Sequence, residues 1–125
     1  MTVNIRIWDA LDDIRGKHHI KYGDWAEASG MKQPRFSELK RISRATQRGE
    51  KNLSGRAFTV QKCCAMIAGL RKLLGDSVVQ KELFDKCSKE EDIDVRLVCM
   101  MAALDLNEKQ QVEMFLKAFV KKVKE

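Results

Sequence analysis

The chain has 125 residues, of which 44% are hydrophobic and 34% are charged. This length suits about one domain, and the composition is typical of a globular protein rather than a disordered or fibrous one. No apolar run approaches the ~18 residues that cross a bilayer, and the polar start does not resemble a secretory signal. We therefore expect a cytoplasmic protein without membrane contact.

The cysteines and histidines indicate no metal or redox chemistry. Four cysteines lie in apolar stretches without a C-x-x-C pair: Cys63, Cys64, Cys87 and Cys99. Such cysteines behave as small buried hydrophobic residues, so we expect inert core thiols. The adjacent His18 and His19 have no second ligand cluster and are interpreted as surface residues. Because no nucleophile–base pair is visible either, we predict neither a cofactor nor enzymatic activity.

Apolar spacing predicts helices throughout the chain. The first covers about residues 3–16, with Asn4 as the expected N-cap and Gly16 near its end. A short polar connector leads to a second helix over about 22–29. Gly30 is expected to end that helix, because glycine tolerates the positive φ of a tight turn.

A third helix is predicted to start near Lys32, with Pro34 tolerated in its first turn. Its inner face is formed by three apolar residues at three-residue steps: Phe36, Leu39 and Ile42. From Arg44 to Ala57 the apolar repeat disappears, and two glycines and many polar residues predict a loop.

A fourth helix is expected after this loop, followed by two or three more. The fourth helix has Thr59 as its N-cap and ends at Gly75. Its apolar stripe consists of Val60, Cys63, Cys64, Ile67, Leu70 and Leu74. The others cover about 77–89, 94–105 and 108–124, and the last is expected to open with a capping box of Asn107 and Gln110.

Positive charge is concentrated in the first part of the chain. Residues 1–75 carry 15 Lys/Arg against 7 Asp/Glu, a net charge of +8, whereas residues 76–125 carry 9 against 11, a net charge of −2. Residues 32–56 alone have eight basic and two acidic side chains, a net charge of +6. A concentrated basic face is the electrostatic footprint of a polyanion-binding protein.

The residues around Gly30 carry the functional argument. The segment from Trp25 to Leu39 is WAEASGMKQPRFSEL, in which the small Ala26 precedes the glycine by four residues. It resembles the Cro/repressor-type (Xre-like) helix-turn-helix family of DNA-binding regulators, whose members have the pattern L-A-x-x-x-G-(V/M)-(S/T)-Q-x-x-(I/F)-S-x-(L/I). The resemblance covers about residues 4–75. Trp25 in place of leucine, Ser29 in place of a more apolar residue, and the longer loop after the third helix depart from that pattern.

The resemblance implies a lambda-repressor-like helical bundle that places the third helix in the major groove of duplex DNA. Residues expected at base edges are Lys32, Gln33, Arg35 and Ser37. Residues expected at phosphates are Lys21, Tyr22, Lys40, Arg41, Arg44, Arg48, Lys51 and Arg56. For Tyr22 a packing role is the alternative. The expected function is that of a transcriptional regulator, in particular a phage, prophage or bacterial repressor acting as a dimer.

The second half of the chain, residues 76–125, is predicted to be a helical extension of the DNA-binding domain in residues 1–75. Residues 93–106 are apolar almost all round, which predicts burial on several sides. The last helix has an amphipathic stripe of Val112, Phe115, Leu116, Phe119, Val120 and Val123. This stripe completes the core or forms a homodimer interface, with a ligand pocket or a partner-protein surface as the further alternatives. As an alternative function, residues 76–125 bind a partner protein, as in an antitoxin or a phage adaptor.

Overall fold

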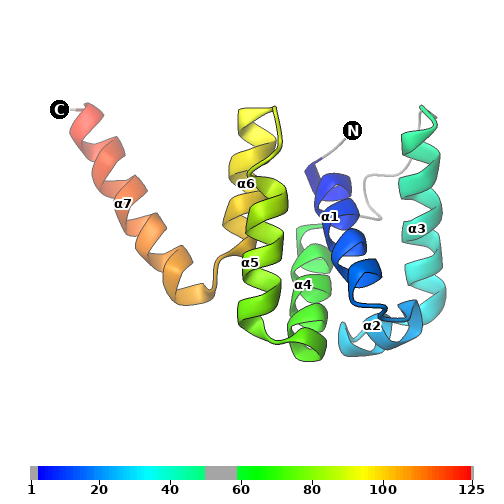
Figure 1. Cartoon of the computed structure of the whole chain (residues 1–125). Helices are drawn as coiled ribbons and strands as arrows, with labels where there is room; N and C mark the ends of the chain where they lie inside the picture. Colours follow the sequence, from blue (N-terminus) through cyan, green and yellow to red (C-terminus); the bar gives the residue numbers. More distant parts are fainter. Residues whose placement is uncertain (1–2, 50–58, 125) are drawn as a thin grey trace.

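The computed structural model describes residues 3–49 and 59–124. Within these ranges the regular structure is α-helical, which confirms the predicted all-α class. The helices are α1 (Val3–Lys17), α2 (Tyr22–Ala28), α3 (Gln33–Gln47), α4 (Val60–Leu74), α5 (Asp76–Cys87), α6 (Ile93–Ala103) and α7 (Leu106–Lys124). Figure 1 shows α3 at one side of the molecule and α7 at the opposite side. In the described ranges, no helix combines the length and the apolar character that a membrane span requires.

Three aromatic side chains form the centre of the core between α1, α2 and α3. Trp8, Trp25 and Phe36 are buried and touch one another in stacked or edge-on geometry. The predicted inner face of α3 is confirmed, because Leu39 and Ile42 are buried beside Phe36. Burial of such side chains is the main source of stability for a helical bundle, so this cluster holds α3 in place.

The boundary predicted at residue 75 does not separate two cores. Val79 and Leu83 of α5 and Cys99 of α6 are buried in the same cluster as the residues of α1 and α4. Helices α5 and α6 therefore complete the first core, and the extension from this body consists of α7 alone (Figure 1).

Helix α3 is longer than predicted. The expected loop from Arg44 is wrong at its start, because α3 continues to Gln47. Three short side chains explain this: Ala45 is buried, Ser43 Oγ donates to Asp9 Oδ1 at 2.6 Å, and Thr46 Oγ1 donates to the carbonyl oxygen of Ile42 at 2.9 Å. The last turns of α3 thus pack through small and polar residues, which an apolar repeat does not reveal.

The predicted caps are confirmed at one helix and wrong at two. Thr59 caps α4 by accepting a hydrogen bond from the backbone nitrogen of Lys62 at 3.1 Å. Asn4 lies inside α1, because that helix already includes Val3. The capping box of α7 begins two residues earlier than predicted. Asp105 Oδ1 accepts from the Glu108 backbone nitrogen at 2.7 Å, and Glu108 Oε1 accepts from that of Asp105 at 3.1 Å.

The stripe predicted on α4 is correct at its centre and wrong at its start. Cys63, Ile67 and Leu70 are buried, whereas Val60 and Cys64 are exposed and Met66 is buried instead. The prediction of four core thiols is therefore wrong for Cys64.

Among the buried cysteines, Cys63 has a clearly perturbed acidity. Burial raises the pKa of the Cys63 thiol to about 12. The thiol thus stays protonated at neutral pH, as expected for an inert core cysteine.

His18 is a structural residue rather than a purely surface one. Its Nε2 lies 2.8 Å from Glu82 Oε2, and Lys17 Nζ lies 2.6 Å from Glu82 Oε1. The hydrogen bond from Lys17 is the main reason why the pKa of Glu82 lies below its ordinary value, and the bond to His18 lowers it further. This ion-pair cluster joins the end of α1 to α5.

The apolar surfaces of α6 and α7 are largely exposed. The prediction that residues 93–106 are buried on several sides is wrong, because only Cys99 and Ala103 of α6 are buried. The proposal that the α7 stripe completes the core is also wrong, because Phe115 is 67% exposed and Phe119 is 56% exposed.

Candidate nucleic-acid interface

The turn between α2 and α3 has the geometry of a Schellman C-cap. Gly30 adopts a φ of 69°, and its N–H donates to the carbonyl oxygen of Glu27 at 3.0 Å. The N–H of Met31 donates to the carbonyl oxygen of Ala26 at 2.9 Å. A Cβ at residue 30 would meet no atom within 4 Å, so the left-handed backbone is what favours glycine. The predicted conformation of Gly30 is confirmed.

The buried Trp25 fixes α2 within the core. Its ring stacks on Trp8 with the centroids 5.1 Å apart and meets Phe36 edge-on at 4.8 Å. Its indole Nε1–H donates to the carbonyl oxygen of Met66 at 3.0 Å. One side chain therefore connects α2 to α1, α3 and α4, and through these contacts it sets the orientation of α3.

Helix α2 also approaches α4 closely at Gly69, which sequence reasoning did not single out. A Cβ on Gly69 would lie 2.9 Å from the backbone nitrogen of Ser29 and 3.0 Å from its Cα. Real Cβ atoms essentially never come this close to backbone atoms. The absence of a side chain at Gly69 therefore lets the end of α2 rest on α4.

Replacing Gly69 by alanine should destabilise the protein by about 1–3 kcal/mol, because the backbone of Ser29 must shift to make room. Chemical denaturation measures this loss. Gly16→Ala is the matched control, since Gly16 lies in α1 with no neighbour within 4 Å of its Cβ position. The control should be neutral or stabilising, as alanine favours helices over glycine. Equal stability of the Gly69→Ala variant and the parent would contradict the close approach.

One exposed row follows the outer face of α3. Its members recur at steps of three or four residues and end at the helix C-cap: Gln33, Ser37, Arg41, Arg44 and Arg48. At 1.5 Å per residue the row is about 22 Å long. It brings two residues predicted at base edges into line with three predicted at phosphates. Polar hydrogen-bonding groups thus occupy the start of the row, and guanidinium groups occupy the rest.

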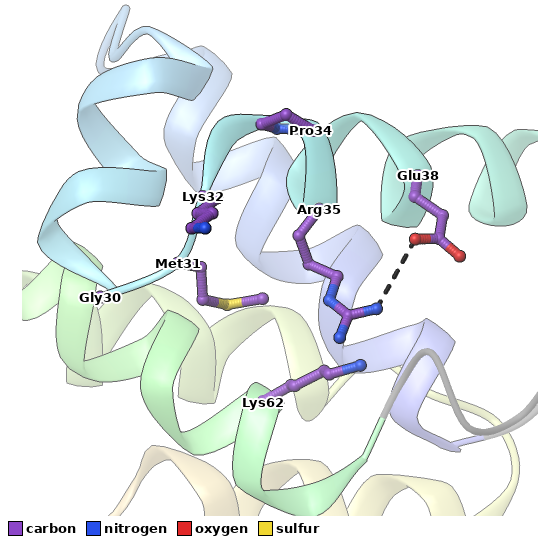
Figure 2. A pocket seen from close by; sticks show the side chains of 7 residues that line it. All are labelled: Gly30, Met31, Lys32, Pro34, Arg35, Glu38 and Lys62. Atoms are coloured by element: carbon purple, nitrogen blue, oxygen red, sulfur yellow. Dashed lines mark ion pairs between the residues drawn. The ribbon is translucent and has the colours of Figure 1, made fainter.

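A second basic face lies between the first turns of α3 and α4 (Figure 2). A groove of about 570 Å³ is lined there by Gly30, Met31, Lys32, Pro34, Arg35, Glu38 and Lys62. Arg35 and Lys62 extend toward the same part of the groove. Arg35 Nη1 lies 3.7 Å from Glu38 Oε2, and both side chains are about half exposed. Because exposed ion pairs contribute little, Arg35 can exchange this partner for another anion at small cost.

The predicted base-edge residues are therefore divided between two faces. Gln33 and Ser37 belong to the outer row, whereas Lys32 and Arg35 face the groove beside α4. Lys62 joins the second face although sequence reasoning missed it. No local signal could have identified it, since the fold alone brings the first turn of α4 to that of α3.

The Tyr22 ring packs against Arg15 of α1 and Lys40 of α3. The Tyr22 ring has the Arg15 guanidinium carbon at 3.8 Å and Lys40 Nζ at 4.4 Å from its centroid. Its hydroxyl accepts a hydrogen bond from Arg15 Nη2 at 3.1 Å. Burial raises the pKa of this hydroxyl, and a hydrogen bond with Asp12 raises it further. These contacts support the packing alternative for Tyr22, while Lys21 next to it is exposed.

Two predicted phosphate contacts, Lys51 and Arg56, lie outside the described residues. The described segment 32–48 has six basic residues and one acidic residue, a net charge of +5. Within the described ranges, no group of three or more potential metal ligands occurs. The surface of α3 thus presents exposed amide, hydroxyl and guanidinium groups, while Phe36, Leu39 and Ile42 on its inner face are buried in the core.

Comparison of the chain with protein-family models, with curated proteins and with solved structures finds no match.

Proposed function

We propose that the chain binds double-stranded DNA sequence-specifically and acts as a transcriptional regulator, with α2 and α3 forming a helix-turn-helix. The observation that carries this proposal is the exposed row from Gln33 to Arg48 on α3. An α-helix fits the major groove of B-DNA, which is about 12 Å wide. The basic face and the resemblance of residues 25–39 to Cro/repressor-type regulators support the same function.

The two ends of α3 have different roles in this proposal. Gln33 forms paired hydrogen bonds with an adenine. Arg35 extends from the face of α3 that borders the groove beside α4 and reaches the O6 and N7 acceptors of a guanine. Arg41, Arg44 and Arg48 neutralise phosphates along the rest of the helix, which supplies affinity without sequence information. Specificity therefore comes from the first turns of α3, and affinity comes largely from its second half.

Selection of binding sites from random duplexes by the full chain tests this proposal. Enrichment of one sequence motif, with affinity that falls steeply as salt rises, is the expected result. If the selected pool stays as random as the starting pool and binds no better than it, the proposed sequence-specific function is wrong.

Within the selected site, Gln33→Ala should weaken binding by about 1–3 kcal/mol, because an adenine loses both of its hydrogen bonds. The salt dependence should stay unchanged, since no phosphate contact is lost. Electrophoretic mobility-shift titrations on the selected and a scrambled duplex measure both quantities. Gln110→Ala on the exposed surface of α7 serves as control. A Gln33→Ala variant that weakens both duplexes equally would contradict the base-edge role.

A further inference from the structure

Helix α7 has an apolar face that this chain does not cover. Its exposed hydrophobic residues include Met114, Phe115, Leu116, Phe119, Val120 and Val123. The rings of Phe115 and Phe119 stack with their centroids 6.4 Å apart. In the part of the chain that the structure describes, α7 shares no extended packing interface with another helix. Figure 1 shows it slanting away from α5 and α6.

The neighbouring surface of α6 is apolar as well. Ile93, Leu97 and Val98 are each about half exposed. This surface continues into an apolar groove of about 320 Å³ between α4 and α6, which is lined by Val98, Met101 and Cys64 among others. The molecule therefore has both a projecting helix with an apolar face and, on α6, an apolar surface on which such a helix could pack.

Hydrogen bonds anchor both sides of the junction between α6 and α7 to other helices. Arg71 Nη2 donates to the carbonyl oxygens of Ala103 at 3.0 Å and Leu104 at 3.4 Å, which ties the end of α6 to α4. Gln80 Nε2 donates to Glu108 Oε1 at 2.5 Å, which ties the first turn of α7 to α5. Folding α7 back onto its own α6 would break the bond between Gln80 and Glu108.

Charge distinguishes between the surfaces that α7 can bind. Residues 106–124 have five basic and two acidic side chains, a net charge of +3. Residues 90–105 have five acidic side chains and one basic, a net charge of −4. Two α7 helices packed only on each other would bring like charges together, whereas α7 on the α6 segment of another copy pairs opposite charges.

The area available is also sufficient for a dimer. Each of the nine exposed side chains named on α6 and α7 offers on the order of 100 Å² of apolar surface, since each is about half exposed or more and an aromatic side chain buries roughly 150–250 Å² in full. The faces of α6 and α7 together therefore offer on the order of 900 Å² per copy. Stable interfaces bury about 800 Å² per partner, so the two faces together offer enough area for a dimer.

We propose that the occupant of this surface is a second copy of the chain, with α7 of each copy lying antiparallel on α6 of the other. Phe115 and Phe119 lie over the groove between α4 and α6 of the partner. Because α7 has 19 residues and α6 has 11, the end of α7 extends past the start of α6. Lys121 and Lys122 thereby come close to Glu91 and Asp94 of the other copy. This proposal does not depend on DNA binding.

Sedimentation equilibrium of the full chain, together with four variants, tests the proposal. The parent should be a dimer. Phe115→Ser/Phe119→Ser should weaken dimerisation by roughly 100-fold or more, because both rings are exposed in the monomer and buried in the dimer. The helix content measured by circular dichroism at low temperature should stay unchanged, which separates the loss of the dimer from unfolding. Val78→Ser on the exposed part of α5 is the matched control and should leave dimerisation unchanged.

A charge exchange identifies the surfaces that meet. Lys121→Glu/Lys122→Glu should weaken the dimer roughly fivefold to tenfold, and adding Glu91→Lys/Asp94→Lys should restore it. A dimer that Lys121→Glu/Lys122→Glu strengthens, or that the second pair does not restore, would overturn the proposed contact between α7 and α6. If the chain is a monomer at all concentrations up to about 100 µM, the proposal is also wrong. In that case α7 packs on its own chain or binds a different protein.

Discussion

Replacing Trp25 by alanine should lower the free energy of unfolding by about 3–5 kcal/mol, the cost typical of removing a large buried aromatic side chain. Trp25 is fully buried and contacts Trp8 and Phe36 directly. The substitution removes these contacts and leaves a cavity at the point where α1, α2, α3 and α4 meet. Because small domains are stable by only about 5–15 kcal/mol, this loss should be visible as a large fall in the melting temperature.

Trp25→Phe separates the contribution of the hydrogen bond to stability from that of packing. This variant keeps an aromatic ring but removes the indole donor, which leaves the buried carbonyl oxygen of Met66 without its bond from Nε1. It should cost about 1–3 kcal/mol. Urea denaturation of both variants gives the two free energies. If Trp25→Ala lowered the free energy of unfolding by less than Trp25→Phe does, the central role of the indole ring in the core would be contradicted.

Replacing Arg41 and Arg44 by glutamine should weaken DNA binding by roughly 50- to 100-fold near 0.1 M salt. Each guanidinium that neutralises a phosphate releases about 0.9 counterion, so each contact contributes close to tenfold at that salt concentration. The slope of the logarithm of affinity against that of salt concentration should become less negative by about 1.8. Because both side chains are exposed on α3, the stability of the fold should change little.

Lys72→Gln/Lys81→Gln is the matched control for this loss. It also removes two positive charges, from exposed positions on α4 and α5. If net charge alone attracts DNA, the two double variants should weaken binding equally. The proposed interface requires instead that the α3 variant has the larger effect at every salt concentration and that only this variant changes the salt slope strongly.

Several features that depend on local chemistry were predictable from the sequence. Gly30 ends α2 because glycine tolerates its positive φ, and Thr59 caps α4 because its hydroxyl reaches a backbone amide. Pro34 stands in the first turn of α3, where a missing N–H is tolerated. The inner face of α3 followed from its apolar repeat. For these reasons the order of the helices could be predicted, together with Gln33 and Ser37 at the start of the exposed row on α3. Arg44 and Arg48 were expected in a loop, so the second half of the row was not predicted.

Features that depend on contacts between distant residues were not predictable. The hydrogen bond from Ser43 to Asp9 extends α3 beyond its apolar repeat, and no pattern within the helix indicates it. The close approach of Gly69 to Ser29 and the position of Lys62 beside Arg35 also result from the packing of separate helices. The stripe on α7 was visible, but an apolar stripe looks the same whether its own chain covers it or a partner does.

Photocrosslinking from α3 tests the proposed DNA-binding surface most directly. A photoreactive amino acid is placed in the full chain at Ser37, in the middle of the exposed row, or at the exposed Lys81 of α5. The two proteins are then irradiated with the duplex obtained by selection. The proposal predicts a crosslink to DNA from position 37 and none from position 81. Binding that persists without a crosslink from position 37, or that gives a crosslink only from position 81, would contradict it.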